Sequence, residues 1–146
     1  MRTTLITGLA LLLTTGVAQA GEALDIVIYG ATGEVGVHVV HEALDRGHLV
    51  TAVSRDPSQV EMQHANLTVI SGDLLDKASV TETVAGKDVV ILSVRGVIGD
   101  SEIPTSALQF IAAETLVDVL STMSDSAPRL LHVGGSGSLE VEPGFH

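Results

Sequence analysis

Three glycines recur at every third position in the stretch "DIVIYGATGEVG", directly after an apolar run. Gly30 would allow a sharp turn out of a strand, Gly33 would let the backbone approach a pyrophosphate, and Gly36 would let the next helix lie close to a sheet. The N-terminus of that helix would present N–H groups and a positive dipole end to an anion. The Thr32 hydroxyl adds a donor, whereas the Glu34 carboxylate would repel a pyrophosphate unless it points outward. The spacing predicts a pyrophosphate-binding loop, with an ordinary turn as the alternative.

The segment "VSRDP" follows the next apolar run and carries the residues that would select between dinucleotides. In sheets of this type an acid accepts hydrogen bonds from the ribose of NAD, whereas an Arg pairs with the 2′-phosphate of NADP. Ser54 is the first candidate contact, and the planar guanidinium of Arg55 suits a phosphate. Asp56 has two alternative roles: its carboxylate could accept hydrogen bonds from the ribose, or it could form an ion pair with Arg55. The segment favours NADP, with NAD as the alternative.

Further polar side chains follow apolar runs at positions where ligands bind in parallel sheets. Asp73 could accept from an adenine amino group or cap the following helix, a role for which Asp76 also qualifies. Arg95 could face a phosphate or a substrate anion, or be a surface charge. Ser136 could hydrogen-bond a carbonyl group near a nicotinamide, or belong to a polar glycine-rich loop. Ser136 is therefore the one candidate for a catalytic role.

The elements that must position these residues follow from hydrophobic periodicity. Apolar runs predict strands at 24–29, 49–53, 67–70, 89–94 and 130–133, and helical spacing predicts helices at 35–46, 79–85 and 105–123. This alternation indicates right-handed crossovers and helices on both faces of a parallel sheet. The sequence thus predicts an α/β fold, a Rossmann-like doubly wound parallel sheet of about five strands. Such a sheet normally continues with another helix and strand, so we expect the C-terminal part of the fold to be missing.

Charge and composition exclude several classes of function. The formal net charge is −11 and the Lys and Arg residues are scattered, so nucleic acid would be repelled. The absence of Cys excludes disulfides, a thiolate metal site and a Cys nucleophile. His38 and His41 lie one helical turn apart, but spacing fixes no third ligand, so a solvated helix face is favoured over a metal site. We expect a small-molecule substrate and no metal, and we expect His132, inside a predicted strand, to lie in the core.

Residues 1–20 have the pattern of a secretory signal peptide. Arg2 is the positive start, residues 5–13 are apolar, and Ala18-Gln19-Ala20 is a cleavage site that predicts a mature N-terminus at Gly21. The apolar run is too short to span a bilayer. The predicted domains are a signal peptide at 1–20 and one NAD(P)-binding domain at 21–146, in a periplasmic or secreted protein. If the leader is not functional, the protein is cytoplasmic.

Five ordered motifs resemble the atypical short-chain dehydrogenase/reductases, in the NAD(P)H-binding, NmrA-like and flavin-reductase-like branch: "YGATGEVG", "VSRDP", "VISGDLLD", "DVVILSV" and "LLHVGGSGSLEV". The likeness runs from about residue 25 to residue 141. It implies a Rossmann fold that binds NAD(P)(H). The cofactor contacts that the resemblance implies are Gly30, Thr32, Gly33, Glu34, Val35, Arg55, Asp73, Leu74, Ser93 and Val94.

Better-known members of that group use a Tyr-x-x-x-Lys pair, in which the Tyr supplies a proton and the Lys lowers its pKa. The single Tyr here, Tyr29, lies in the first predicted strand, and no Lys follows Lys87. Catalysis would therefore rest on hydride transfer from a well-positioned cofactor, with water as the proton source. Three hypotheses follow: an oxidoreductase acting on a small organic substrate, a non-catalytic NAD(P)-binding sensor, and a truncated inactive remnant.

Overall fold

The computed structural model describes residues 21–94 and 105–134. In this part of the chain, five parallel strands form one sheet in the order β3-β2-β1-β4-β5. The strands are β1 (Asp25–Tyr29), β2 (Leu49–Ser54), β3 (Leu67–Ser71), β4 (Val89–Leu92) and β5 (Arg129–His132). The helices are α1 (Gly36–Asp45), α2 (Lys77–Val84) and α3 (Thr105–Thr122), with short 3-10 turns η1 (Pro57–Gln59) and η2 (Ser124–Ser126).

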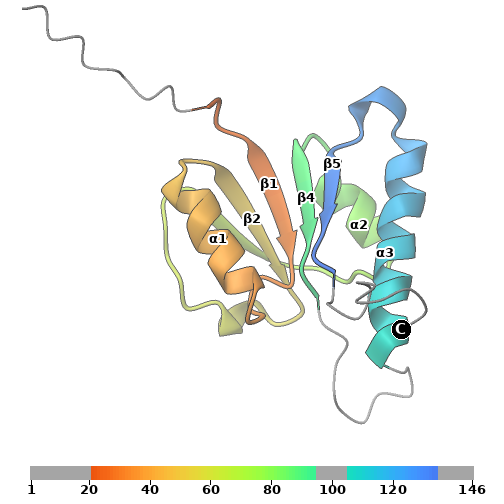
Figure 1. Cartoon of the computed structure of the whole chain (residues 1–146), viewed down its shortest axis with the longest axis horizontal. Helices are drawn as coiled ribbons and strands as arrows, with labels where there is room; N and C mark the ends of the chain where they lie inside the picture. Colours follow the sequence, from red (N-terminus) through yellow and green to blue (C-terminus); the bar gives the residue numbers. More distant parts are fainter. Residues whose placement is uncertain (1–20, 95–104, 135–146) are drawn as a thin grey trace, which may run out of the picture.

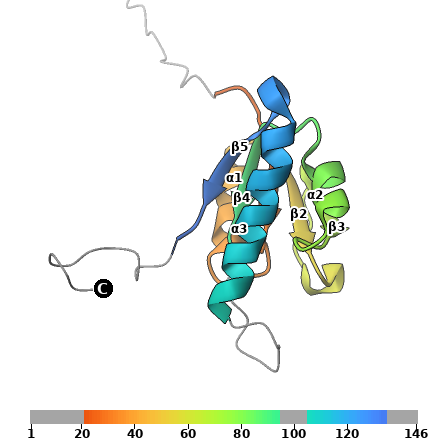
Figure 2. The ribbon, with the colours of Figure 1, turned by 90° about the vertical axis from the view of Figure 1, so that its right-hand side faces the viewer.

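Helices cover both faces of the sheet (Figure 1, Figure 2). α1 lies on one face, and α2 and α3 pack against each other on the other face. Successive side chains of β1 point to opposite faces, which divides the core in two. Val27 and Tyr29 pack with α2 and α3, whereas Ile26 and Ile28 pack with α1. The strand order and the two helical layers confirm the predicted Rossmann-like α/β fold.

The strand register brings the start of the glycine loop to one edge of the sheet. Tyr29, the last residue of β1, is level with Val53 of β2 and with Leu92 of β4. Gly30 therefore leaves the sheet between the ends of β2 and β4, where the strand order changes direction. In open parallel sheets, ligands bind at the carboxyl edge beside this switch point.

A polar network closes the opposite edge of the sheet. The ammonium group of Lys87 donates to both carboxylate oxygens of Asp25 at 3.0 Å and to the Thr51 hydroxyl at 3.3 Å. The N–H of Asp25 donates to the Asp88 carboxylate at 2.7 Å. These contacts join the start of β1 to the connection before β4, so the charged groups at this edge have a structural role.

α1 begins at Gly36, one residue after the predicted start of this helix, and its buried residues are Gly36, Val40, Ala43 and Leu44. One expectation about a single residue is wrong. His132, expected in the core, is exposed because β5 is an edge strand of the described sheet.

Several predictions fall on residues that the structure does not describe. The leader at 1–20, Arg95 and Ser136 lie outside the described ranges, as does the segment 135–146 that bears on a missing C-terminal part. Within the described ranges, no helix has the length and apolar character needed to cross a membrane.

Candidate functional site

The loop after β1 forms a tight turn that depends on its glycines. Gly30 has a φ of +82°, a region open mainly to glycine. A Cβ atom on Gly30 would overlap the carbonyl oxygen of Ser93, at the end of β4. The Gly30 carbonyl oxygen accepts a hydrogen bond of 2.9 Å from the N–H of Gly33, which closes the turn. The loop thus has the close packing that its glycine spacing predicts.

α1 begins at the end of this loop with unsatisfied backbone donors. No side chain caps the helix, and within the described part of the chain neither the N–H of Val35 nor that of Gly36 has a protein acceptor. The helix dipole adds positive potential at these donors. Thr32, Glu34 and Val35 are exposed around them. A helix end of this kind can bind an anion. A Cβ on Gly33 would lie 3.1 Å from the Gly30 carbonyl oxygen, so a side chain there would crowd the loop.

The end of β2 presents an arginine to solvent. Arg55 is exposed, and it takes part in none of the ion pairs formed among residues 21–94 and 105–134. On either side of it, the Ser54 hydroxyl donates to the carbonyl oxygen of Asp56 at 2.9 Å. The Asp56 carboxylate accepts hydrogen bonds from Ser58 and Gln59. The structure therefore does not pair Arg55 with Asp56, one of the alternatives that the sequence left open.

The end of β3 separates the roles of two acids. The Asp76 carboxylate accepts from the N–H of Ala78 at 2.9 Å and caps α2. The exposed Asp73 carboxylate instead accepts from the N–H of Leu75 at 2.9 Å, in a local turn at the carboxyl edge. Leu74 is half-buried against the core beneath α2 and α3. The helix cap belongs to Asp76, which leaves Asp73 at the edge where an adenine contact was predicted.

The end of β4 forms the floor beneath the glycine loop. Ser93 is buried, and its N–H donates to the carbonyl oxygen of Tyr29 at 2.9 Å. Val94 is half-buried and packs on the core. Both predicted contacts therefore lie next to the loop, with little side-chain surface exposed at Ser93. Arg95 and Ser136 are not placed, because they lie outside the described residues.

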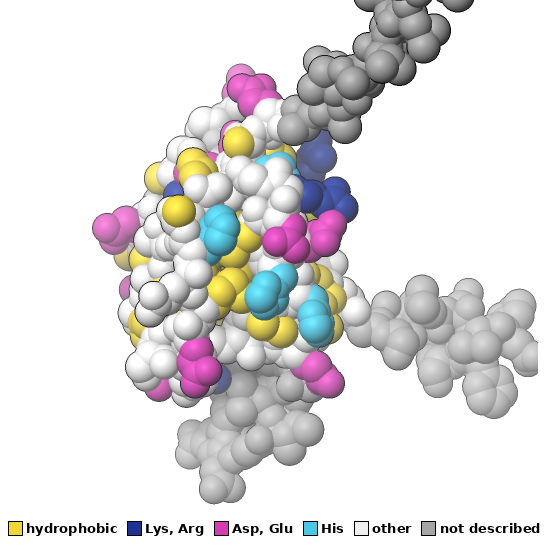
Figure 3. Space-filling view, turned by 90° about the vertical axis from the view of Figure 1, so that its left-hand side faces the viewer, with side chains coloured by type: hydrophobic (Ala, Val, Ile, Leu, Met, Phe, Trp, Pro, Cys, Tyr) yellow, Lys and Arg dark blue, Asp and Glu magenta, His cyan; other side chains and the backbone are white. Residues whose placement is uncertain are grey.

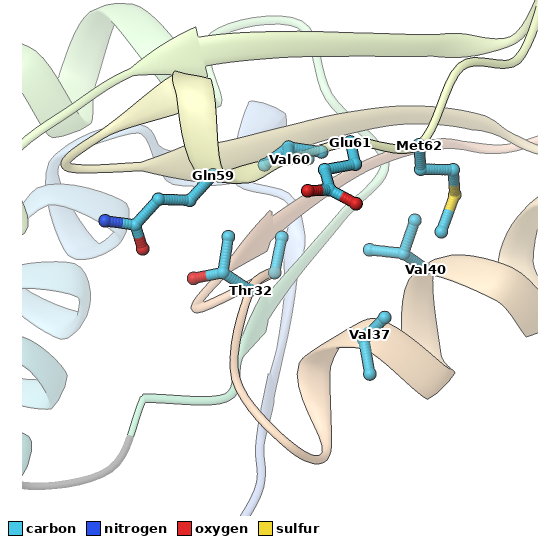
Figure 4. A pocket seen from close by; sticks show the side chains of 9 residues that line it. Thr32, Val37, Val40, Gln59, Val60, Glu61 and Met62 are labelled. Carbon is cyan, nitrogen blue, oxygen red and sulfur yellow. The ribbon is translucent and has the colours of Figure 1, made fainter.

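A pocket of about 220 Å³ lies beside the loop, between α1 and the segment that follows β2 (Figure 4). Its lining residues are Ala31, Thr32, Val37, Val40, Ala52, Gln59, Val60, Glu61 and Met62. No motif in the sequence marks residues 59–62 as part of a site. The sequence between β2 and β3 has turn residues but no helical periodicity, which is the one local indication that no full helix covers this side of α1. In the structure this connection holds only the short turn η1. Without a full helix there, space remains next to α1.

Histidines lie on the face that carries α1 (Figure 3). His38 and His41 are exposed on this helix, and histidine side chains lie among apolar and acidic ones in this view. Among the residues that the structure describes, no group of three or more His, Cys, Asp or Glu side chains could hold a metal ion. The candidate site is therefore built from the glycine loop and the strand ends.

Residues 30–146 match a family model described as NAD(P)H-binding. The match begins at the first glycine of the loop and covers most of the sequence. This chain belongs to the NAD(P)H-binding family. The family's cofactor is a nicotinamide dinucleotide, as the resemblance carried by the five motifs implied.

Individual relatives agree with this membership. The chain is 38% identical over 82 residues to an isoflavone reductase homolog of Zea mays, which covers 50% of this chain and 26% of the relative. A solved candidate epimerase from Bacteroides thetaiotaomicron is 32% identical, with a TM-score of 0.69, over 84% of this chain and 52% of that one. A candidate exported protein from Burkholderia pseudomallei is 37% identical, with a TM-score of 0.64, over 84% of this chain and 53% of that one. The chain thus spans about half of these structures.

Proposed function

We propose that this domain belongs to an NADP(H)-dependent oxidoreductase that transfers hydride between the nicotinamide and a small organic substrate. The observation that carries the proposal is the placement of two anion-binding features at one edge of the sheet. The uncapped N-terminus of α1 suits a pyrophosphate, and Arg55, without an ion pair in the described part of the chain, suits a 2′-phosphate. The likeness to an isoflavone reductase homolog supports reductase chemistry.

The residues of this chain would hold the two halves of the cofactor separately. The N–H groups of Val35 and Gly36 would bind the pyrophosphate, and Arg55 would pair with the phosphate on the adenosine ribose. Asp73 would accept from the adenine amino group. The pocket in Figure 4 lies on the side of Thr32 and Gln59. In this arrangement the adenosine half would lie next to the pocket, and the substrate would bind elsewhere, beyond the ends of β4 and β5.

The chemistry of the reduction would come mainly from the cofactor. When bound, the nicotinamide supplies or accepts the hydride. Tyr29 is buried in the core, so its hydroxyl is not exposed to give a proton to a substrate. In the proposed reaction water supplies the proton, and Ser136 is the candidate for holding a substrate carbonyl by a hydrogen bond.

Cofactor titration tests the binding part of this proposal. Wild-type protein should bind NADPH more tightly than NADH in a nicotinamide fluorescence titration. Arg55→Ala should weaken NADPH binding about tenfold or more, the size of a lost charge-assisted contact, and should change NADH binding much less. Arg46→Ala is the matched control, because Arg46 pairs with Glu42 at the other end of α1. Equal losses for both cofactors in Arg55→Ala would reject the NADP assignment.

Turnover tests the enzymatic part. NADPH oxidation should be followed with a panel of quinones, flavins and aldehydes, in wild-type protein and in Ser136→Ala. Turnover with any of these acceptors supports a reductase, and loss of turnover in Ser136→Ala with unchanged NADPH binding supports the role of Ser136. Tight NADPH binding without turnover would favour the non-catalytic sensor.

We also propose that residues 1–20 direct export of the protein. The pattern of the leader and the likeness to a candidate exported protein support this. Cell fractionation of the full chain, followed by N-terminal sequencing, should find a periplasmic or secreted product that begins at Gly21. An intact N-terminus in the cytoplasmic fraction would reject export.

A further inference from the structure

The segment that follows β2 is fixed on both sides of Arg55. The Ser54 hydroxyl donates to the carbonyl oxygen of Asp56 at 2.9 Å and accepts from the N–H of Asp56 at 3.2 Å. The N–H of Gly72 donates to the carbonyl oxygen of Ser54 at 3.2 Å, which ties this position to the end of β3. Arg55 is thus the single residue between two hydrogen-bonded neighbours at the carboxyl edge.

The Asp56 carboxylate is the centre of this arrangement. One of its oxygens accepts from the N–H of Ser58 at 3.1 Å and from the Ser58 hydroxyl at 2.6 Å, and the other accepts from the side-chain amide of Gln59 at 3.1 Å. Asp56 is the N-cap of η1, whose first residue is Pro57. The hydrogen bonds from Ser58 and Gln59 hold the pKa of the Asp56 carboxyl below its usual value, so the charged acceptor is the form that they stabilise.

These contacts reach the wall of the pocket beside the glycine loop. Gln59 lines that pocket together with Thr32, so the residue that Asp56 holds lies next to the loop that would bind the pyrophosphate. The Asp56 carboxylate already accepts three hydrogen bonds, which leaves about one of its roughly four acceptor sites. An acid near this position usually accepts hydrogen bonds from the ribose hydroxyls of NAD, and Asp56 has less capacity for that role than a free carboxylate.

We propose that Asp56 is a positioning residue for NADP selectivity: by capping η1 and holding Gln59, it sets the loop that presents Arg55 to the 2′-phosphate. The inference rests on the proposed function of Arg55 and goes beyond it, because it assigns the selectivity to an acid that does not touch the cofactor. The inference predicts that removal of Asp56 weakens NADPH binding, whereas simple electrostatics predicts the opposite change. Removing a negative charge near a phosphate strengthens binding by Coulomb's law, whereas loss of the cap weakens binding by releasing Arg55.

Four variants separate these effects. Asp56→Ala should raise the dissociation constant for NADPH about fivefold, the size of a lost cap, and change that for NADH by less than about twofold. Asp56→Asn keeps an acceptor oxygen and should restore most of the NADPH affinity. Ser58→Ala should give an intermediate loss. Asp45→Ala removes an exposed acid at the far end of α1 and controls for the change in net charge.

The readout is the ratio of the NADPH and NADH dissociation constants, measured beside thermal unfolding of each variant. A merely structural role would weaken both cofactors together, and this result would overturn the inference. Unchanged or tighter NADPH binding in Asp56→Ala would also overturn it, while the preference of the wild-type protein for NADPH would leave the proposed function in place. If the wild-type protein binds neither cofactor, the proposed function fails and the inference fails with it.

Discussion

Gly36, the first residue of α1, lies so close to Gly30 that a Cβ atom on Gly36 would overlap the Gly30 carbonyl oxygen. That oxygen is not free to move, because it accepts the 2.9 Å hydrogen bond from the N–H of Gly33. The same hypothetical Cβ would lie 3.2 Å from the Cα atom of Ala31. The third glycine of the loop therefore sets how closely α1 packs on the end of β1, and it does so through backbone atoms.

Gly36→Ala should destabilise the protein by about 1–3 kcal/mol, because an added methyl group in a closely packed site forces backbone shifts. Thermal or urea unfolding measures the loss. Gly134→Ala is the matched control, since a Cβ there has no atom within 4 Å and the residue has no positive φ. Equal stability of the two variants would show that the loop relaxes easily around a side chain at Gly36.

The glycine loop and the alternation of strands and helices could be predicted from the sequence because both follow local rules. The backbone has a positive φ at Gly30 and leaves no room for a Cβ at Gly36. Both conditions favour glycine, so the type and spacing of these residues predict the turn. The five strands follow apolar runs between turn residues, which periodicity detects. Family motifs then placed Arg55 and Asp73 at strand ends, where the structure has them.

Other features depend on distances that periodicity does not set. Whether Asp73 or Asp76 caps α2 depends on a helix boundary, and the boundary is uncertain by one or two residues from sequence alone. The exposure of His132 depends on which strand lies at the sheet edge. The pocket beside Thr32 depends on how residues 59–62 return over α1, and no motif marks that path.

Asp76→Ala should lower the stability of the protein by about 1 kcal/mol, because it removes the hydrogen bond from the N–H of Ala78 at the start of α2. Asp76→Asn, which keeps a capping oxygen, should recover most of that loss. Asp73→Ala should cost less stability and weaken NADPH binding instead, as expected for an adenine contact. Thermal unfolding and fluorescence titration of the same three variants distinguish the two acids. Weaker NADPH binding in Asp76→Ala alone would reverse the assignment.

Tyr29→Phe should leave stability unchanged or raise it by about 1 kcal/mol at neutral pH. The Tyr29 side chain is 2% exposed, and its hydroxyl has no hydrogen-bond partner among the described residues. The nearby Thr83 hydroxyl donates to the carbonyl oxygen of Ser79 at 2.8 Å. A buried hydroxyl without a partner carries a desolvation cost that phenylalanine avoids. Urea unfolding at pH 7 gives the difference, and a loss of more than about 1 kcal/mol in Tyr29→Phe would show that the hydroxyl is hydrogen-bonded in solution.

The same residue makes stability depend on alkaline pH. Burial raises the pKa of the Tyr29 hydroxyl above its usual value of 10.0. Below pH 10 the residue is protonated in both the folded and the unfolded chain, so its contribution to stability is fully present. As the pH rises through 10, the unfolded chain loses this proton before the folded chain does, and stability falls. Wild-type protein should therefore lose more stability than Tyr29→Phe between pH 9 and about pH 11, the range in which an unfolded tyrosine titrates. The two proteins share every other titratable group, including the paired Lys87 and Asp25, so the difference between their pH profiles reports on Tyr29 alone. Parallel profiles would contradict the raised pKa.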